Sequence, residues 1–274
     1  MYSRPALDSH PSTRIWKHSN SPGPDLIVDG KLLQNHWLVR DESFAADGCA
    51  TVEGGITPGS HPVLRFSVST PNVGDRDLAL GDPNVHIAAN DGLYEFATCH
   101  HHFHFRHYAS YELVDPKTGK TWRAAKRGFC MIDVAPNPAW LGQAPGKAQY
   151  RSCGSVGYPG NQGISAGWAD VYSEFLQGQL FVLDGSDGQA PVPDGDYTIR
   201  ITVNPGFTPA SGEPCRYADP HQAGLCHQLP ESNYENNVAE SHVTVTSHPG
   251  RVGVGPGTSD PEPVGERDEF GNKL

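Results

Sequence analysis

The stretch DYTIRITVN at residues 196–204 carries the clearest structural signal in the chain. Its apolar residues occupy every second position and polar residues occupy the positions between them, which is the pattern of a strand with one buried face. The same alternation recurs in VLRFSVS (63–69), FLQGQLFVLD (175–184) and VAESHVTVT (238–246), whereas no segment shows a sustained helical period. The pattern predicts an all-β fold: a single β-sandwich-like domain with long loops and little helix.

The composition agrees with a turn-rich β architecture and argues against several classes of protein. The 274 residues include 31 Gly and 24 Pro, about a fifth of the chain, which is high for a helical protein. The net charge of −11 argues against nucleic-acid binding, because that binding depends on Lys and Arg. No segment approaches the roughly 18 apolar residues that a membrane-spanning helix needs.

Two polar segments flank the region that carries the strand pattern. Residues 1–23 are punctuated by Pro and Ser, and residues 248–274 are rich in Gly, Pro and charge. Segments of such composition bury too little apolar surface to fold. We expect a flexible N-terminal arm at 1–23, a folded domain at 24–247 and a disordered tail at 248–274.

The six cysteines favour an oxidising compartment. None of them forms a Cys-x-x-Cys pair, so neither a zinc ribbon nor a thioredoxin motif is indicated. An even number at wide spacing permits three disulfide bonds and favours a secreted or extracellular protein, although residues 1–24 show no apolar signal-peptide core. Buried free thiols in a cytosolic protein are the alternative.

Five histidines fall within CHHHFHFRH at residues 99–107. They follow LYEFAT, which is typical of extended chain, so His100, His102 and His104 are expected on the same face of one strand. Three neutral imidazoles on one face can bind copper, zinc, iron or nickel. A zinc hydrolase that uses these three histidines and a polar strand with exposed histidines are the alternatives.

Around these histidines the chain resembles the catalytic domain of the lysyl oxidases and looks like a bacterial-type homologue. YEFATCHHHFHF matches the family's copper segment, with Cys99 and the three histidines in corresponding positions. Further matches follow in the family's order: AAKRGFCMID around Lys126, GISAGWADVY ending in Tyr172, then VNPGF and PESNYENNV. The resemblance covers about residues 24–246.

The resemblance implies a copper-dependent amine oxidase of the protein-lysine 6-oxidase type. Copper would bind the three histidines, and Lys126 and Tyr172 would form the lysine tyrosylquinone (LTQ) cofactor. A primary amine, such as a lysine side chain in a peptide or protein, would react with O2 to give aldehyde, ammonia and hydrogen peroxide. Asp170 precedes Tyr172 by two residues, shares its face on an expected strand and is our candidate base. A copper-binding module without catalysis is the alternative.

The resemblance also bears on how the cysteines pair. One pair follows from family position, and a second closes residues 210–229, which look inserted relative to the family. The last two cysteines lack their usual short-range partners and are expected to pair with each other. The expected pairs are Cys99–Cys153, Cys215–Cys226 and Cys49–Cys130.

A second metal site, for calcium, is expected far from the histidines. PESNYENN at 230–237 places four oxygen-bearing side chains within seven residues, and calcium prefers such hard ligands. Some lysyl oxidases hold calcium between such a segment and an Asp-Leu near the domain start. The expected ligands are Asp25, Leu26 (through its carbonyl), Glu231, Asn233, Asn236 and Asn237. An Asn-rich turn that caps its own backbone is the alternative.

Overall fold

The structure, a computed structural model, describes residues 22–137, 146–211, 214–246 and 253–254. Most of the expected N-terminal arm and C-terminal tail lies outside these residues. Gly253 and Val254 form β17, which pairs with β1. Strands dominate the described part and only short helices accompany them, so the all-β prediction is confirmed.

One layer of the fold is a four-stranded sheet in the order β16-β13-β7-β8. These strands are β16 (Val238–Val245), β13 (Gly195–Val203), β7 (Ala109–Val114) and β8 (Thr121–Arg123), and each neighbouring pair is antiparallel. The alternating apolar residues of β13 are all buried, as its sequence predicts: Tyr197, Ile199, Ile201 and Val203.

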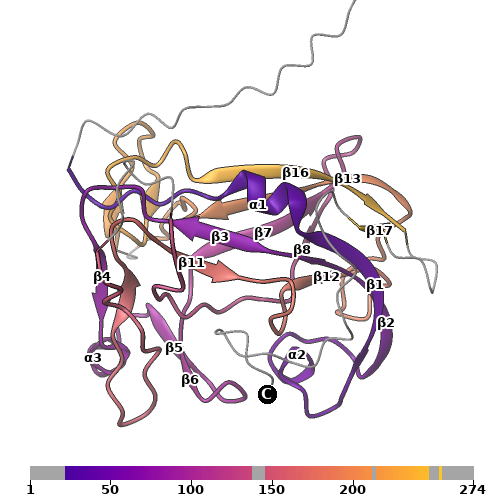
Figure 1. Ribbon diagram of the computed structural model, residues 1–274, viewed down its shortest axis with the longest axis horizontal. Coiled ribbons are helices and arrows are strands. Elements are labelled where there is room, and N and C mark those ends of the chain that lie inside the picture. The colour runs from indigo at the N-terminus through magenta and orange to yellow at the C-terminus, as the bar shows by residue number, and fades with distance from the viewer. Residues whose placement is uncertain (1–21, 138–145, 212–213, 247–252, 255–274) are drawn as a thin grey trace, which may run out of the picture.

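The opposite layer consists of two sheets whose strands alternate along the chain, because β12 and β17 of one sheet follow the strands of the other. One has the order β12-β2-β1-β17 and the other has the order β3-β11-β9. Between β2 and β3, the Ser67 N–H donates to the His36 carbonyl, so the expected strand at 63–69 is divided there. In Figure 1, β3 and β11 run beside β13 and β7. The bounds are β1 (Trp37–Phe44), β2 (Gly59–Phe66), β3 (Val68–Pro71), β9 (Ala135–Pro136), β11 (Trp168–Tyr172) and β12 (Leu180–Val182).

The strand expected at 175–184 is shorter than predicted. The Leu176 N–H donates to the Ser173 carbonyl and the Gln179 N–H donates to the Leu176 carbonyl, so the chain before β12 is occupied by turns. Gly178 has a φ of 70°, which glycine adopts without steric cost. Only the three residues of β12 pair with β2.

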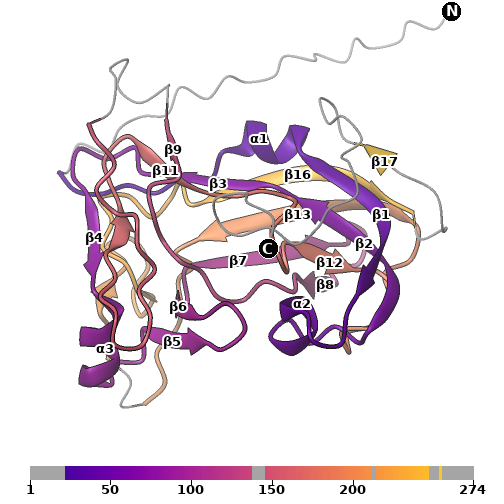
Figure 2. The same cartoon turned by 60° about the horizontal axis from the view of Figure 1, so that its bottom comes forward.

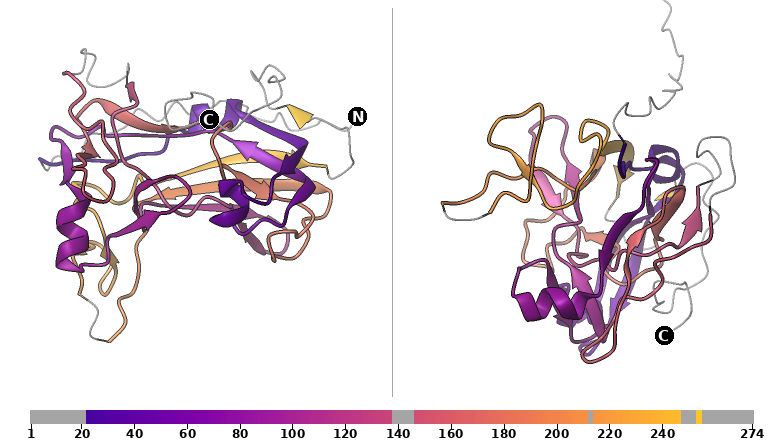
Figure 3. Two further views of the ribbon diagram at one scale, coloured as in Figure 1. Left: turned by 90° about the horizontal axis from the view of Figure 1, so that it is seen from below. Right: turned by 90° about the vertical axis from the view of Figure 1, so that its left-hand side faces the viewer.

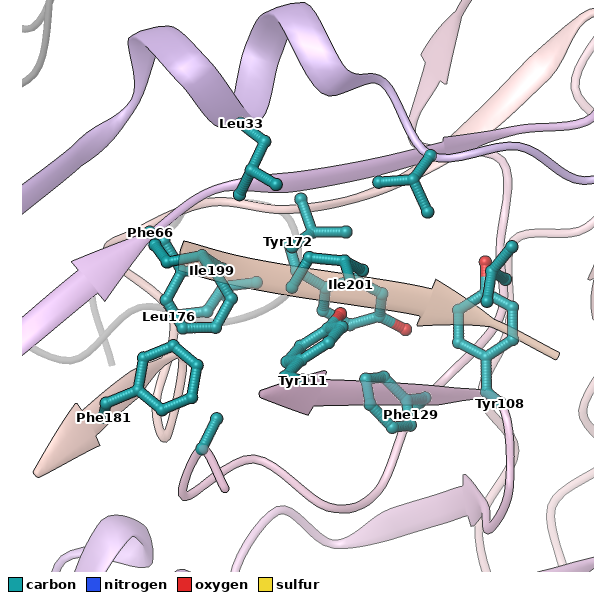
Figure 4. Packing of buried hydrophobic residues seen from close by; sticks show 14 of the residues in the cluster. Leu33, Phe66, Tyr108, Tyr111, Phe129, Tyr172, Leu176, Phe181, Ile199 and Ile201 are labelled. Atoms are coloured by element: carbon teal, nitrogen blue, oxygen red, sulfur yellow. The ribbon is translucent and has the colours of Figure 1, made fainter. Parts of the chain in front are cut away.

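The two layers enclose one apolar core (Figure 4). Phe66 of β2 stacks on Phe181 of β12 with ring centroids 4.9 Å apart, and meets Tyr111 of β7 edge-on at 5.4 Å. Leu33 closes the core from α1 and is fully buried. Burying a side chain of this kind contributes about 1.5–3 kcal/mol, so these contacts hold the layers in one arrangement.

Short helices and two-stranded ladders surround the layers. Asp29 and Asp82 cap the N-termini of α1 and α3 through their side chains. The bounds are α1 (Gly30–Asn35), α2 (Cys49–Val52), α3 (Pro83–Ala89), β4 (Leu78–Gly81) with β10 (Gln162–Ile164), β5 (Tyr94–Ala97) with β6 (His102–Phe105), and β14 (Tyr217–Ala218) with β15 (Cys226–His227).

The small elements that carry the histidines lie on one side of the molecule. In Figures 1 and 2, α2 and the β5–β6 ladder lie on the side away from α1. The segment between β13 and β16 projects from one end (Figure 3). Among the residues that the structure describes, no helix is long and apolar enough to cross a membrane.

Candidate functional site

The histidine segment forms a hairpin instead of the single extended strand that its sequence predicts. β5 and β6 pair antiparallel, with Ala97 opposite His102. The His101 N–H donates to the Ala97 carbonyl at 2.8 Å, and His101 has a φ of 58°, in the left-handed region. This reversal places His100 in the turn. The prediction of three histidines on one strand was therefore wrong, because only His102 and His104 share a strand face.

The reversal nevertheless brings the rings of His100, His102 and His104 together. The ring centroid of His100 lies 5.6 Å from that of His102 and 5.2 Å from that of His104. The Nε2 atoms of His102 and His104 are 3.1 Å apart, close to the spacing of two nitrogens bound to one metal at about 2 Å. Burial lowers the pKa of His102 to about 4 and strongly lowers the pKa of His104. Both rings are therefore neutral at pH 7 and keep a lone pair.

The donor chemistry of this histidine triad fits copper or zinc, since both bind neutral imidazole. Within the described ranges, no group of three or more His, Cys, Asp or Glu side chains is arranged so that it could hold a metal ion as it stands. The triad therefore supplies the nitrogen donors without a finished coordination sphere.

Two residues that the sequence analysis did not single out shape the triad. The Glu53 Oε2 lies 2.5 Å from the His100 Nδ1. A Cβ at Gly128 would lie 2.2 Å from the His104 Nδ1, so only a residue without a side chain permits this approach. Gly128 stands inside the AAKRGFCMID motif, where its position beside Lys126 was a usable signal. Glu53 lies 47 residues before His100, and no sequence pattern points to it.

Lys126 and Tyr172 lie beside each other. The Lys126 Nζ is 4.9 Å from the centroid of the Tyr172 ring and 5.4 Å from that of Phe129. Phe129 packs edge-on against Tyr172 with ring centroids 5.4 Å apart, and both rings are labelled in Figure 4. The two expected cofactor precursors therefore lie in contact without a bond between them.

β11 carries Tyr172 and Asp170 into the core on one face. Tyr172 is 2% exposed, and its hydroxyl donates to the Cys130 carbonyl at 3.0 Å. Burial, followed by the charge of Asp170, raises the pKa of Tyr172 well above its usual range. Burial also raises the pKa of Asp170, while Tyr172 and the Lys126 ammonium oppose that shift. The Asp170 carboxyl is therefore harder to ionise than a carboxyl exposed to water.

A cavity of about 250 Å³ connects the histidine triad to the lysine. His100, His104 and Lys126 line it, together with Glu53 and Gln177. The Gln177 Oε1 is buried and has no hydrogen-bond partner among the described residues. The cavity gives one space in which a ligand can approach both the imidazoles and Lys126.

Most residues expected to bind calcium meet where the start of the domain contacts its end. The Leu26 N–H donates to the Glu231 Oε2 at 2.6 Å, and the Asn237 Nδ2 donates to the Glu231 Oε1 at 2.9 Å. The Asn236 Nδ2 donates to the Asp25 Oδ1 at 2.9 Å. The Leu26–Glu231 and Asn236–Asp25 bonds connect residues that are more than 200 positions apart in sequence, whereas Asn237 and Glu231 are six positions apart.

The donor chemistry of this cluster fits calcium, with one exception. The buried Oδ1 atoms of Asn236 and Asn237 have no hydrogen-bond partner among the described residues, and calcium binds such amide oxygens. Burial raises the pKa of Glu231 to about 8, which a bound cation would counteract. Asn233 is the exception, because its Oδ1 accepts from the Glu235 N–H at 3.0 Å, as in the alternative of an Asn-rich turn.

All six cysteines are paired, but only one expected pair is present. The prediction of Cys215–Cys226 is confirmed. A disulfide needs Cα atoms within a few ångströms, and the turn of the histidine hairpin places Cys99 beside α2. The remaining cysteines pack together in a small apolar cluster. The observed bonds are Cys49–Cys99 and Cys130–Cys153, so the predictions of Cys99–Cys153 and Cys49–Cys130 were wrong.

Several known proteins are similar to this sequence over most of its length. Protein-lysine 6-oxidase from Gallus gallus is 23% identical over 237 residues, covering 82% of this chain and 46% of the relative. The Sus scrofa protein of the same name is also 23% identical, with 82% of this chain and 78% of the relative covered. Lysyl oxidase homolog 2 from Homo sapiens is 24% identical over 236 residues, with 82% and 25% covered. The chain thus spans about half the length of the Gallus gallus relative.

The family comparison covers the residues that form the site. Residues 24–213 match the family model described as Lysyl oxidase. That range contains the histidine hairpin, Lys126 and Tyr172, and it extends over more than half of the sequence. The chain belongs to the lysyl oxidase family.

Proposed function

We propose that this chain is a copper-dependent amine oxidase that converts primary amines to aldehydes with release of ammonia and hydrogen peroxide. His100, His102 and His104 hold the copper, and Lys126 and Tyr172 form lysine tyrosylquinone. Relatives named protein-lysine 6-oxidase support peptidyl lysine as the substrate.

The observation that carries the proposal is the position of Lys126. Its Nζ lies 4.9 Å from the centre of the Tyr172 ring, and the residue also lines the cavity that contains His100 and His104. A metal at the triad would therefore act next to a paired lysine and tyrosine. Neither a hydrolytic zinc site nor a copper-storage site needs that pair.

The groups around the Tyr172 ring hold the ring in place and provide a route for proton transfer. Copper with O2 would supply the oxidising power for the ring, and the cofactor formed from Lys126 and Tyr172 would supply the electron sink for amine oxidation. The Cys130 carbonyl holds the Tyr172 hydroxyl, and Phe129 packs against the ring edge-on. Asp170 lies two residues before Tyr172 on β11 and would serve as the base that moves protons at the ring. The surrounding core excludes bulk water.

Peptide mass spectrometry of copper-loaded protein tests the proposal together with an assay of hydrogen peroxide. We expect a cross-linked peptide pair that contains residues 126 and 172, and peroxide release with a lysine peptide. Lys126→Arg and Tyr172→Phe should both abolish the cross-link and reduce peroxide release to background.

Lys120→Arg is the matched control, because Lys120 also lies over an aromatic ring, with its Nζ 4.5 Å from the centroid of Trp122. This variant should keep wild-type activity. Full activity in Lys126→Arg would refute the cofactor assignment. Stoichiometric copper without peroxide would favour the non-catalytic copper-binding module.

Two further assignments accompany this function. Three disulfide bonds support secretion into an oxidising environment. Calcium at Asp25, Leu26, Glu231, Asn236 and Asn237 would have a structural role, tying the start of the domain to its end. A calcium titration that leaves the melting temperature unchanged would contradict this second site, because selective binding to the native state must stabilise it.

A further inference from the structure

We propose that Glu53 is a positioning residue that fixes the ring of His100 so that its Nε2 is the metal-binding nitrogen; this inference rests on the copper site proposed above. The two oxygens of Glu53 have different partners in the hairpin turn. Its Oε2 is 2.5 Å from the His100 Nδ1, and its Oε1 accepts from the Cys99 N–H at 2.6 Å.

Helix α2, which carries Glu53 at its C-terminus, is held in place by several contacts. Glu53 is the C-cap residue of α2, and its N–H donates to the Cys49 carbonyl at 2.9 Å. The Cys49–Cys99 disulfide fixes this helix to the hairpin turn. Gly54 allows the next turn to wind tightly, since a Cβ there would lie 2.4 Å from the Ala50 carbonyl oxygen. A small apolar cluster anchors α2 beneath: Phe44, Ala50, Ile56, Val63, Ala125, Leu180 and Val182.

The chemistry of the contact selects one tautomer of His100. A carboxylate accepts hydrogen bonds, so it favours the proton on Nδ1 and leaves the lone pair on Nε2. Metal-bound histidines are commonly held in this way, by a carboxylate on the other ring nitrogen. His100 has particular need of such a contact, because it lies in the turn, outside β6.

The other carboxylate that lines the cavity has a different environment. The side chain of Glu95 is 51% exposed and pairs with Arg106 at 3.6 Å. Glu95→Gln therefore removes the same charge from the same cavity without touching His100, which makes it the matched control for Glu53→Gln.

The experiment measures copper affinity by chelator competition and the copper EPR spectrum, both without turnover. Glutamine keeps the shape of Glu53, but its amide can donate to Nδ1 and so favours the tautomer with the proton on Nε2. We expect Glu53→Gln to bind copper more weakly by a factor on the order of 10–100 and to lose one nitrogen from the EPR hyperfine pattern. Glu53→Asp, which keeps an acceptor, should recover part of the affinity, and Glu95→Gln, which removes a charge opposite His104 without a contact to His100, should keep every nitrogen of the EPR hyperfine pattern.

Nitrogen NMR of metal-free wild-type protein gives a readout that does not depend on any variant. We expect His100 to carry its proton on Nδ1, and a proton on Nε2 would overturn the inference. Unchanged affinity and EPR spectrum in Glu53→Gln would also overturn it. If His102→Ala leaves wild-type copper binding intact, the proposed copper site itself fails, and that result is distinct from either outcome for Glu53.

Discussion

The candidate site has two halves that the fold positions by different means. The cofactor half contains Lys126 and Tyr172 and is centred on strand β11, and the metal half is the histidine triad of the β5–β6 hairpin. Tyr172 lies on β11, the middle strand of the β3-β11-β9 sheet, opposite Val68 of β3, and is 2% exposed. His100 lies in a turn of a two-stranded ladder, and its side chain is 20% exposed. A two-stranded hairpin is at best marginally stable by itself, so the metal half depends on its attachments.

Those attachments are hydrogen bonds, one disulfide bond and side chains of the hairpin that are buried in the main core, such as Phe103 and Phe105. The Phe105 N–H donates to the Phe129 carbonyl at 2.6 Å and joins β6 to the chain beside Lys126. The Cys49–Cys99 bond and the contacts of Glu53 hold the turn. We infer that single substitutions at the hairpin should change metal binding sharply, whereas substitutions around Tyr172 should first change stability.

The largest expected effect is that of Gly128→Ala on the metal half. The added Cβ would lie 2.2 Å from the His104 Nδ1, so the ring must leave its position. We expect copper affinity to fall by a factor on the order of 100, with a stability loss of about 1–3 kcal/mol from overpacking. Chelator competition and urea unfolding measure the two effects. Unchanged copper affinity would show that His104 is not a ligand.

Removing the Cys49–Cys99 disulfide bond should lower both the stability of the fold and the copper affinity. Cys49→Ser with Cys99→Ser opens a bond that spans 50 residues and should cost about 2–4 kcal/mol. Copper affinity should fall as well, because the turn with His100 is released. Cys215→Ser with Cys226→Ser is the control: it opens an 11-residue separation away from the triad, and copper affinity should stay at the wild-type level. Equal loss of affinity in both variants would contradict the comparison.

Phe129→Leu, at the position next to Gly128, should lower stability but leave copper affinity almost unchanged. Phe129 packs edge-on against Tyr172, Tyr108 and Tyr111, so a smaller side chain leaves a cavity and should cost about 1–3 kcal/mol. Copper affinity should remain within a few fold of wild type. An affinity loss as large as that of Gly128→Ala would show that the halves are not held independently.

The smallest expected effect concerns Glu231, which lies outside both halves. Burial raises its pKa from 4.5 to about 8, so the folded state holds a proton that the unfolded state releases above pH 4.5. Its contribution to stability is therefore greatest in acid and is lost as the pH rises through 8, at no more than about 1.4 kcal/mol per pH unit. In EDTA, wild-type protein should lose more stability between pH 5.5 and 7.5 than Glu231→Gln does, as measured by urea unfolding.

Glu240→Gln, at an exposed carboxyl paired with Arg200, should follow wild type in that comparison. Added calcium should reduce the difference between wild type and Glu231→Gln, because the cation favours the ionised carboxylate. A difference that calcium leaves unchanged would favour the Asn-rich turn.

The all-β class and the strand at residues 196–204 could be predicted from the sequence, but the spatial arrangement of the candidate site residues could not. Alternation at residues 196–204 reports which side chains face the core, because successive strand residues point to opposite faces. The hairpin was missed because LYEFAT continues into histidines without a Gly or Pro that marks a turn, and His101 adopts its positive φ of 58° despite its side chain. Glu53 was missed because its role depends on a contact across 47 residues.

The sequence by itself determined the all-β class, the supply of three imidazoles, and the presence of a lysine and a tyrosine suited to a quinone cofactor. Only the tertiary structure decided the pairing of Cys49 with Cys99, the turn that gathers the imidazoles, and the placement of the Lys126 amine over the Tyr172 ring. The physical reason is the sequence separation over which each kind of interaction acts. Strand alternation is a local property of the chain, whereas disulfide partners, carboxylate–histidine contacts and cofactor precursors depend on how distant segments pack around a shared core.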